Sequence, residues 1–190
     1  MIEFRRAGPA DFVERLETVI DIYTAAMDPP VDQISGRKTI MRNHATYPFF
    51  QCYFAELRDS SPDPASAEPV TVGFAYGFRG VPGQWWHDVV LRGLADRLGE
   101  EAARAWMRRA FELAEVHVHP GYQGKGVGRA MIGALCAGRR EYSAILSTHD
   151  RPTAARHLYA SMGFADLLTR FVFPGGSDEY AIAGRPLPLT

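Results

Sequence analysis

Apolar residues recur every three or four positions in five stretches of the chain, which is the spacing of one helix face. The first stretch begins at Pro9, where proline and a nearby aspartate favour a helix start, and ends before two prolines at residues 29–30. Further helices are predicted over residues 35–45, 100–107 and 127–137, and after residue 152 up to Gly163. The expected inward-facing residues are Phe12, Leu16, Val19, Ile20 and Tyr23; Ile40 and Met41; Val127, Met131, Ile132 and Leu135; and Ala155, Leu158, Tyr159 and Met162.

Shorter runs rich in β-branched and aromatic residues are typical of strands. They cover residues 2–6, 50–57, 71–78, 111–119, 143–147, 164–173 and 180–183. A polar, proline-bearing loop, RDSSPDPASAEP, is predicted over residues 58–69, exposed to solvent. The order of helices and strands predicts one α/β domain over residues 1–190, without repeats. Residues 80–109 form an inserted loop and helix between the third and fourth strands.

Composition narrows the class of protein. A chain of 190 residues with 46% hydrophobic and 23% charged residues is an ordinary globular protein that can bury a core. Its 21 basic and 22 acidic residues give a net charge of −1, so we expect no nucleic-acid or membrane partner. We see no signal peptide, and Cys52 and Cys136 form neither a disulfide framework nor a CxxC motif. We therefore expect a cytoplasmic protein.

The segment HPGYQGKGVGRAM, residues 119–131, joins a predicted strand to a predicted helix. Backbone N–H groups at a helix start attract anions, and glycine lets a ligand's oxygen atoms approach closely, so this loop predicts a phosphate site. A P-loop would need Ser or Thr after Lys125, where this chain has Gly126. A dinucleotide-binding GxGxxG usually opens a domain, whereas this loop lies past the middle of the chain. A third pattern, Gln/Arg-x-x-Gly-x-Gly/Ala, is satisfied by residues 123–128.

With this third pattern, the chain resembles the GNAT acyltransferase family. Val118-His119-Pro120 is similar to the family's V-x-P exit from its fourth strand, and residues 158–164, LYASMGF, match its L-Y-x-x-x-G-F signature. Residues 2–11 resemble its first strand and helix start, so the resemblance covers most of the chain, apart from residues 80–109. It implies a mixed, mostly antiparallel central sheet that is splayed between its two middle strands. About four helices would flank this sheet, besides the inserted helical segment.

The resemblance also implies that the loop holds the pyrophosphate of acetyl-CoA, which serves as co-substrate. The residues expected to contact acetyl-CoA are Val116, Val118, Gln123, Gly124, Lys125, Gly126, Val127, Gly128, Arg129 and Thr153. Many members carry an asparagine for the pantetheine arm at the position of Pro152. In this chain, part of that contact must be lost or be taken over by water, Thr153 or backbone.

Acetyl transfer to an amine requires a neutral amine, a polarised thioester carbonyl and a protonated leaving thiolate. Relative to Gln123, Glu112 stands where several family members carry their base, and Glu115 is the second candidate. A solvated or salt-bridged carboxylate is the alternative interpretation of both. Backbone N–H groups near Val116 and Val118 would polarise the carbonyl. Tyr159 matches the tyrosine that serves as general acid, and its alternative role is that of a core aromatic residue.

Two histidines on the same strand, His117 and His119, suggest a metal site, because the side chains of residues two apart on a strand point the same way. The sequence offers no third ligand at a convincing spacing, so we expect no metal. His117 is instead a residue that could face the substrate.

Two aromatic segments remain, at residues 85–87 and 47–50. The resemblance implies that they lie on the acceptor side, where they could recognise an apolar or cationic amine. Packing of the insertion, or the interface of a homodimer, explains them equally well. We expect an N-acetyltransferase that acts directly on a primary amine of a small molecule or peptide. The alternative is a non-catalytic acyl-CoA-binding regulatory module.

Overall fold

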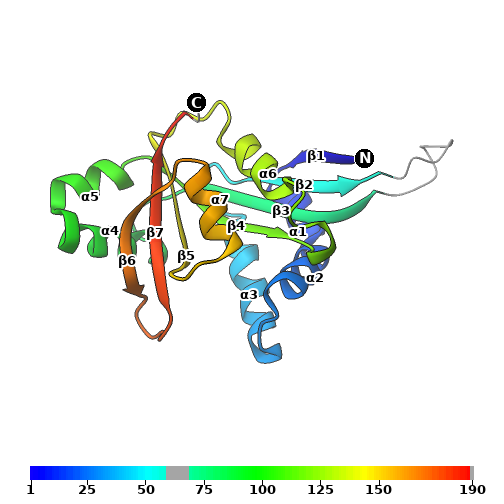
Figure 1. Cartoon of the computed structure of the whole chain (residues 1–190), viewed down its shortest axis with the longest axis horizontal. Coiled ribbons are helices and arrows are strands. Elements are labelled where there is room, and N and C mark those ends of the chain that lie inside the picture. Colours follow the sequence, from blue (N-terminus) through cyan, green and yellow to red (C-terminus); the bar gives the residue numbers. More distant parts are fainter. Residues whose placement is uncertain (59–68, 189–190) are drawn as a thin grey trace. The chain divides into compact units, whose positions relative to one another are not determined.

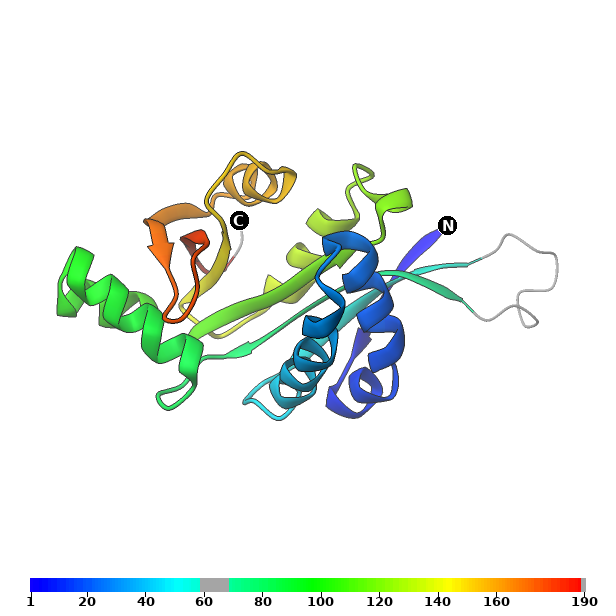
Figure 2. The same cartoon turned by 90° about the horizontal axis from the view of Figure 1, so that it is seen from below.

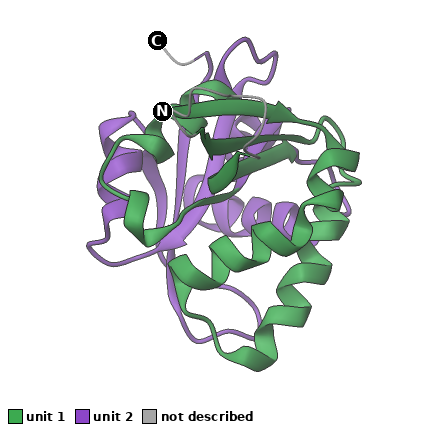
Figure 3. Cartoon of the chain, turned by 90° about the vertical axis from the view of Figure 1, so that its right-hand side faces the viewer, with its two compact units in different colours: residues 1–78, 115–135 green, residues 79–114, 136–190 purple. Residues whose placement is uncertain are grey.

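A computed structural model describes residues 1–58 and 69–188 of the chain (Figure 1). Contacts divide the chain into two compact units: unit 1 comprises residues 1–78 and 115–135, and unit 2 comprises residues 79–114 and 136–190 (Figure 3). The single domain over residues 1–190 therefore stays a prediction. Most of the loop predicted over residues 58–69 lies outside the described residues.

Unit 1 begins with β1 Ile2–Ala7, α1 Pro9–Glu14, α2 Leu16–Met27, α3 Val31–His44 and β2 Gln51–Leu57. It continues with β3 Val70–Arg79, β4 Ala110–Val118, a 3-10 turn Pro120–Tyr122 and α6 Val127–Cys136. Of these, β3 belongs to unit 1 up to residue 78, β4 from residue 115 and α6 up to residue 135. Strand β2 pairs antiparallel with both β1 and β3. Helices α1–α3 cover one face of these strands and α6 covers the other (Figure 2). Residues 72–78 of β3 are accordingly all buried, as expected of a strand covered on both faces.

The inward faces predicted for unit 1 are largely confirmed. Phe12 is fully buried, and its ring centroid lies 4.9 Å from that of Tyr76 and 5.1 Å from that of Phe50. The four predicted residues of α6 are at most 3% exposed. Ile40 was expected inside but is 45% exposed, whereas Met41 is fully buried. Successive residues on a helix point about 100° apart, so this narrow contact of α3 accommodates one of the two.

The first predicted helix is divided in two at Arg15, whose φ of −95° and ψ of 14° are not helical. Its Nη1 donates to Oε1 of Glu56 at 2.9 Å, and Nε of Arg5 donates to the same oxygen at 3.0 Å. The Glu56 side chain is only 2% exposed, and a buried carboxylate needs cationic partners. The break lets Arg15 supply one of these, which helical periodicity alone does not predict.

Unit 2 contains α4 Trp85–Leu98, α5 Glu100–Met107, the beginning of β4, β5 Ser143–His149, α7 Ala154–Ser161, β6 Ala165–Val172 and β7 Glu179–Pro186. Residues 110–112 of β4 run parallel to residues 143–145 of β5, whereas β7 pairs antiparallel with both β5 and β6. Within residues 1–58 and 69–188, the hydrogen-bonded order of the strands is β1-β2-β3-β4-β5-β7-β6. This confirms the predicted α/β class with a mixed, mostly antiparallel sheet; the splay stays a prediction.

The inserted segment is part of the unit 2 core. Helices α4 and α5 contribute half of a buried apolar cluster: Val90, Leu94, Ala103 and Met107 pack with Ala110, Ile145, Leu168 and Ile182. They lie on one face of β5, β7 and β6, and α7 lies on the other (Figure 2). Residues 80–109 therefore complete a hydrophobic core and are not a surface decoration.

Gly80 permits the burial of a polar pair in unit 2. A Cβ at this position would lie 1.9 Å from Oε1 of Glu112 and 2.7 Å from Nδ1 of His87. We expect Gly80→Ala to lower the free energy of unfolding by about 1–3 kcal/mol, because the buried carboxylate must move. Gly36→Ala is the matched control. Gly36 lies within α3 with no atom within 4 Å of its Cβ position, so alanine there should stabilise by up to about 1 kcal/mol. Urea unfolding of both variants tests this, and equal effects would contradict it.

Candidate functional site

The glycine loop of unit 1 forms an open backbone turn at the start of α6. Gly124 and Gly126 have φ values of 72° and 80°, in the left-handed region that favours glycine. Apart from the adjacent residues, no atom of the described part of the chain lies within 4 Å of a Cβ built on either residue. Residues 123–126 are exposed, whereas Val127, the first residue of α6, is 3% exposed. The loop thus leaves room for a ligand against its backbone.

The side chains of this loop hold its own backbone. Nε2 of Gln123 donates to the carbonyl of Val118 at 2.9 Å, and Nζ of Lys125 donates to the carbonyl of Gly121 at 3.0 Å. Ala130 N–H donates to the Gly126 carbonyl at 3.0 Å and closes the first turn of α6. The first N–H groups of an α-helix generally have no acceptor within the helix, and the helix dipole makes this end positive. This combination can bind a phosphate or pyrophosphate.

The remaining residues predicted near the loop have mixed surroundings. Val116 and Val118 are half-buried in β4, and Gly128 and Arg129 lie in the first turn of α6, where Arg129 is exposed. Thr153 lies in unit 2 and caps α7: its Oγ1 accepts from Arg156 N–H at 3.1 Å. Its hydroxyl therefore already has one partner.

Glu115 lies at the centre of a buried polar cluster in unit 1. Its side chain is 8% exposed, and Oε1 accepts from Nη1 of Arg37 at 3.1 Å. Oε2 hydrogen-bonds Nε2 of His117. Burial by itself would raise the pKa of Glu115. The hydrogen bond and the charge interaction with His117, followed by the charge of Arg37, outweigh burial and lower the pKa below its ordinary value. Glu115 is therefore held as an ionised carboxylate.

A second buried hydrogen bond adjoins this cluster, between Nδ1 of His44 and the hydroxyl of Tyr76 at 2.9 Å. Burial lowers the pKa of His44 to about 4, and the charge of Arg37 lowers it as well, against an opposite effect of Glu115. His44 is consequently neutral at neutral pH. Tyr76 is fully buried.

Glu112, the first candidate base, belongs to unit 2. It is 3% exposed, and Oε1 lies 3.1 Å from Nδ1 of His87 at the start of α4. Burial raises the pKa of Glu112 above its ordinary value, although the hydrogen bond with His87 acts in the opposite direction. The pair fixes the beginning of α4 against β4.

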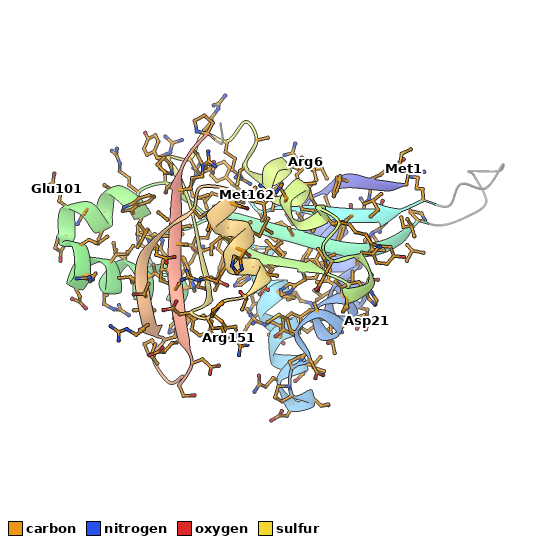
Figure 4. The ribbon with its side chains drawn as sticks, in the orientation of Figure 1. Met1, Arg6, Asp21, Glu101, Arg151 and Met162 are labelled. Carbon is orange, nitrogen blue, oxygen red and sulfur yellow. The ribbon has the colours of Figure 1, made fainter. Side chains whose placement is uncertain are left out.

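Tyr159 lies on α7 and lines a cavity of about 420 Å³ in unit 2. It is half-buried, with its ring centroid 5.9 Å from that of Phe164. In Figure 4, the labelled residues Arg151 and Met162 lie just before and just after α7. The lining of the cavity includes Thr148, Asp150, Arg151, Arg156, His157 and Phe164. A cavity of this size can hold part of a small ligand beside the Tyr159 ring.

Some residues of the two aromatic segments pack inside the protein, and others are exposed. Trp86 Nε1 donates to Ser147 Oγ at 3.2 Å. Together with the pair between His87 and Glu112, this hydrogen bond holds the inserted segment against β4 and β5 of unit 2. Trp85 is 58% exposed and lies 5.6 Å from the Phe173 ring. Phe49 is 62% exposed. An acceptor-binding role for either exposed ring stays a prediction.

The sequence did not point to three of these residues: Arg37, His44 and Tyr76. His87 was predicted only as part of the aromatic segment 85–87 and not as the partner of Glu112. Arg37 and His44 lie in a weakly amphipathic helix, and Tyr76 lies in an apolar strand, so no local pattern marks them. The described part of the chain contains no group of three His, Cys, Asp or Glu side chains that could hold a metal ion. Over the same residues, no helix has the length and apolarity needed to cross a membrane.

Comparisons with known proteins give consistent matches. A family model described as Acetyltransferase (GNAT) domain matches residues 87–166. GCN5-like protein acetyltransferase Rv2170 of Mycobacterium tuberculosis is 34% identical over 198 residues, which cover 95% of this chain and 96% of that protein.

Solved structures agree in fold. The yncA protein of Salmonella typhimurium, determined with its cofactor acetyl-CoA, matches with a TM-score of 0.62 at 18% identity, over 99% of this chain and 95% of that one. The ribosomal-protein-S18-alanine N-acetyltransferase of Escherichia coli matches with a TM-score of 0.60 at 18% identity, over 100% and 96%.

The buried imidazole of His44 predicts a loss of stability in acid. The unfolded chain binds a proton near the ordinary value of 6.5, but folded His44 does so only near 4, so the free energy of unfolding falls as pH falls through this window. The contribution is on the order of 3 kcal/mol. Glu115, Arg37 and Tyr76 face the same ring, so we compare His44→Gln, in which they remain. Urea unfolding between pH 7.5 and 4 should show that the free energy of unfolding falls more steeply with falling pH in the wild type than in His44→Gln. Parallel plots of this free energy against pH for the two proteins would exclude His44 as the cause.

Proposed function

The chain belongs to the GNAT acetyltransferase family, and from this membership we propose that it transfers an acetyl group from acetyl-CoA directly to a primary amine. The observation that carries the proposal is the open glycine loop at the start of α6. A pyrophosphate is a doubly charged anion, and the loop offers backbone N–H groups, a positive helix end and space beside Gly124 and Gly126. When bound, acetyl-CoA supplies an activated acetyl group as a thioester.

In this proposal, the backbone of residues 123–129 binds the pyrophosphate, and Gln123 and Lys125 keep the loop in shape. Arg129 adds positive charge on the first turn of α6. Thr153 and the backbone next to Pro152 contact the pantetheine arm. The N–H groups of Val116 and Val118 polarise the thioester carbonyl, in the manner of an oxyanion hole.

Tyr159 is proposed as the general acid that protonates the leaving thiolate. Its half-buried hydroxyl-bearing ring beside a cavity supports this role. For the base, the cluster around Glu115 offers the better candidates, because Glu112 is buried with His87 at the start of α4. Those contacts of Glu112 favour a role in stability.

The acceptor is proposed to be an amine of a peptide or protein before one of a small molecule. The support is indirect: the relative with 34% identity is named a protein acetyltransferase, and it matches nearly the whole chain. The two cysteines are free and buried, as in proteins of reducing compartments, which supports a cytoplasmic location.

Acetyl-CoA binding is tested by thermal unfolding. Millimolar acetyl-CoA should raise the melting temperature, because a ligand at 100 times its Kd stabilises by about 2.7 kcal/mol. Gly126→Ala should weaken this shift for two reasons. Its methyl group would lie in the anion site, and the positive φ of this residue is strained for alanine. Gly138→Ala is the matched control: its φ is 64° with equally open space, but it lies outside the loop. Both variants should lose about 1–2 kcal/mol of stability.

An assay of thiol release over a panel of amines and peptides then separates the enzyme from the acyl-CoA-binding module. Binding without transfer to any acceptor would favour the module. An unchanged melting temperature with acetyl-CoA would remove the premise of both.

Tyr159→Phe tests the general acid. Turnover should fall about 100-fold or more, with little change in acetyl-CoA affinity, because only a proton donor is removed. Tyr142→Phe serves as the control, since Tyr142 is a 47% exposed tyrosine of the same unit outside the site. Initial rates and the thermal shift with acetyl-CoA measure the two quantities. Wild-type turnover in Tyr159→Phe would assign the acid to another group.

A further inference from the structure

Unit 1 buries a charged pair and an imidazole together at the end of β4. We name Arg37, Glu115 and His117 the β4 triad. Glu115 and His117 are two residues apart on one strand, so their side chains lie on the same face. Their side chains are 8% and 10% exposed. Arg37 reaches the same carboxylate from α3, and its guanidinium carbon lies 5.1 Å from the centre of the Tyr23 ring.

The hydrogen bonds of the β4 triad determine which nitrogen of His117 carries the hydrogen. Oε2 of an ionised carboxylate can only accept, so Nε2 of His117 must be the donor. In the neutral ring the lone pair is then on Nδ1. Within residues 1–58 and 69–188, no group hydrogen-bonds to Nδ1. This nitrogen is thus a base without a protein partner.

We propose that Nδ1 of His117 takes the proton from the acceptor amine, and that Glu115 and Arg37 position the imidazole for this step. The inference rests on the proposed function, since it assigns the base of that reaction. It differs from the expectation that Glu112 or Glu115 is the base.

Glu115 is a poor base in this setting. Both of its oxygen atoms are engaged, one by Arg37 and the other by His117. Its pKa lies below the ordinary value, so it has little tendency to take a proton. What the carboxylate can do is hold the ring in one orientation and stabilise the imidazolium that forms, as a positioning residue.

The groups facing His117 leave Arg37 and Glu115 as the fixed charges of the pocket. The Tyr23 ring of α2 meets the imidazole edge to face at 5.1 Å, and the Phe74 ring of β3 lies at 5.3 Å. His44 is neutral at neutral pH and bonded to the hydroxyl of Tyr76. The charges of Arg37 and Glu115 cancel, so a proton on His117 gives the cluster a single positive charge next to a carboxylate.

Acetyl transfer begins at the amine. An ammonium acceptor gives one proton to Nδ1 of His117, and the nitrogen lone pair that is freed attacks the thioester carbonyl carbon. The C–N bond forms and the C–S bond breaks, and the sulfur leaves with the bonding pair as a thiolate. A second proton from the nitrogen replaces the one that Tyr159 gives to the thiolate, and His117 releases its proton to solvent.

The tautomer is tested on the wild-type protein by nitrogen NMR of its histidines. His117 should show a hydrogen on Nε2 and none on Nδ1. In Glu115→Gln, the amide can donate to Nε2, so the hydrogen should move to Nδ1 and remove the basic lone pair. A wild-type ring with its hydrogen on Nδ1 would overturn the inference.

Kinetics test the proton transfer. His117→Asn should lower kcat/KM about 100-fold to 10,000-fold at neutral pH. The fall in rate toward acid pH, the acidic limb of the pH profile, should move to the higher pH at which the acceptor amine itself loses its proton. The loss should shrink at high pH, where the free amine needs no base. Glu115→Gln should lower kcat with little change in the KM of acetyl-CoA. His87→Asn is the matched control, because His87 is also buried against a β4 glutamate; it should keep the acidic limb.

The outcomes separate two failures. If the wild type transfers acetyl but the acidic limb of His117→Asn stays at the pH of the wild type, the inference is overturned and the proposed function stands. If the wild type transfers acetyl to no amine, the proposed function fails and the inference fails with it. The inference is supported if the acidic limb moves to higher pH in His117→Asn but not in His87→Asn, and if the hydrogen of the His117 ring moves to Nδ1 in Glu115→Gln.

Discussion

An ionised carboxylate cannot be buried unless donors or cations meet its oxygen atoms. Among the residues that the structure describes, four glutamates, Glu56, Glu112, Glu115 and Glu141, are at most 8% exposed. Their partners come from different elements: two arginines near α1 for Glu56, His87 at the start of α4 for Glu112, Arg37 of α3 for Glu115, and Arg79 and Arg139 for Glu141. Helices within each unit are therefore fixed by charge as well as by apolar packing. Apolar packing supplies stability, and the buried polar pairs determine how the helices are placed against the strands within each unit.

Local patterns predicted most elements because each depends on neighbouring residues. The glycine loop and the buried face of α6 follow directly from spacing, since the same few residues determine helix start, backbone freedom and apolar contact. The polar pairs could not be predicted in this way. His87 is 25 residues from Glu112, and Arg37 is 78 residues from Glu115. No periodicity links such distant residues, so a carboxylate on a strand could be identified but its partner could not.

The same limit applies to function. The family match concerns a fold and a cofactor loop, and a fold accommodates many acceptors. The family model begins at residue 87, inside α4, so the segment left over by the sequence motifs is partly within the family's own pattern. Arg37, on a weakly amphipathic helix, belongs to no motif of the sequence and yet pairs with a β4 carboxylate. Specificity is therefore to be sought among residues that pair across the fold.

The boundaries between the two units fall inside β3, β4 and α6, at residues 78/79, 114/115 and 135/136. Neither unit is a contiguous piece of the chain. Domains that are joined by exposed linkers can be expressed apart or exchanged between proteins. Here each cut would sever a strand or a helix and leave its backbone hydrogen bonds without partners. The two units therefore cannot be expressed apart without breaking regular secondary structure.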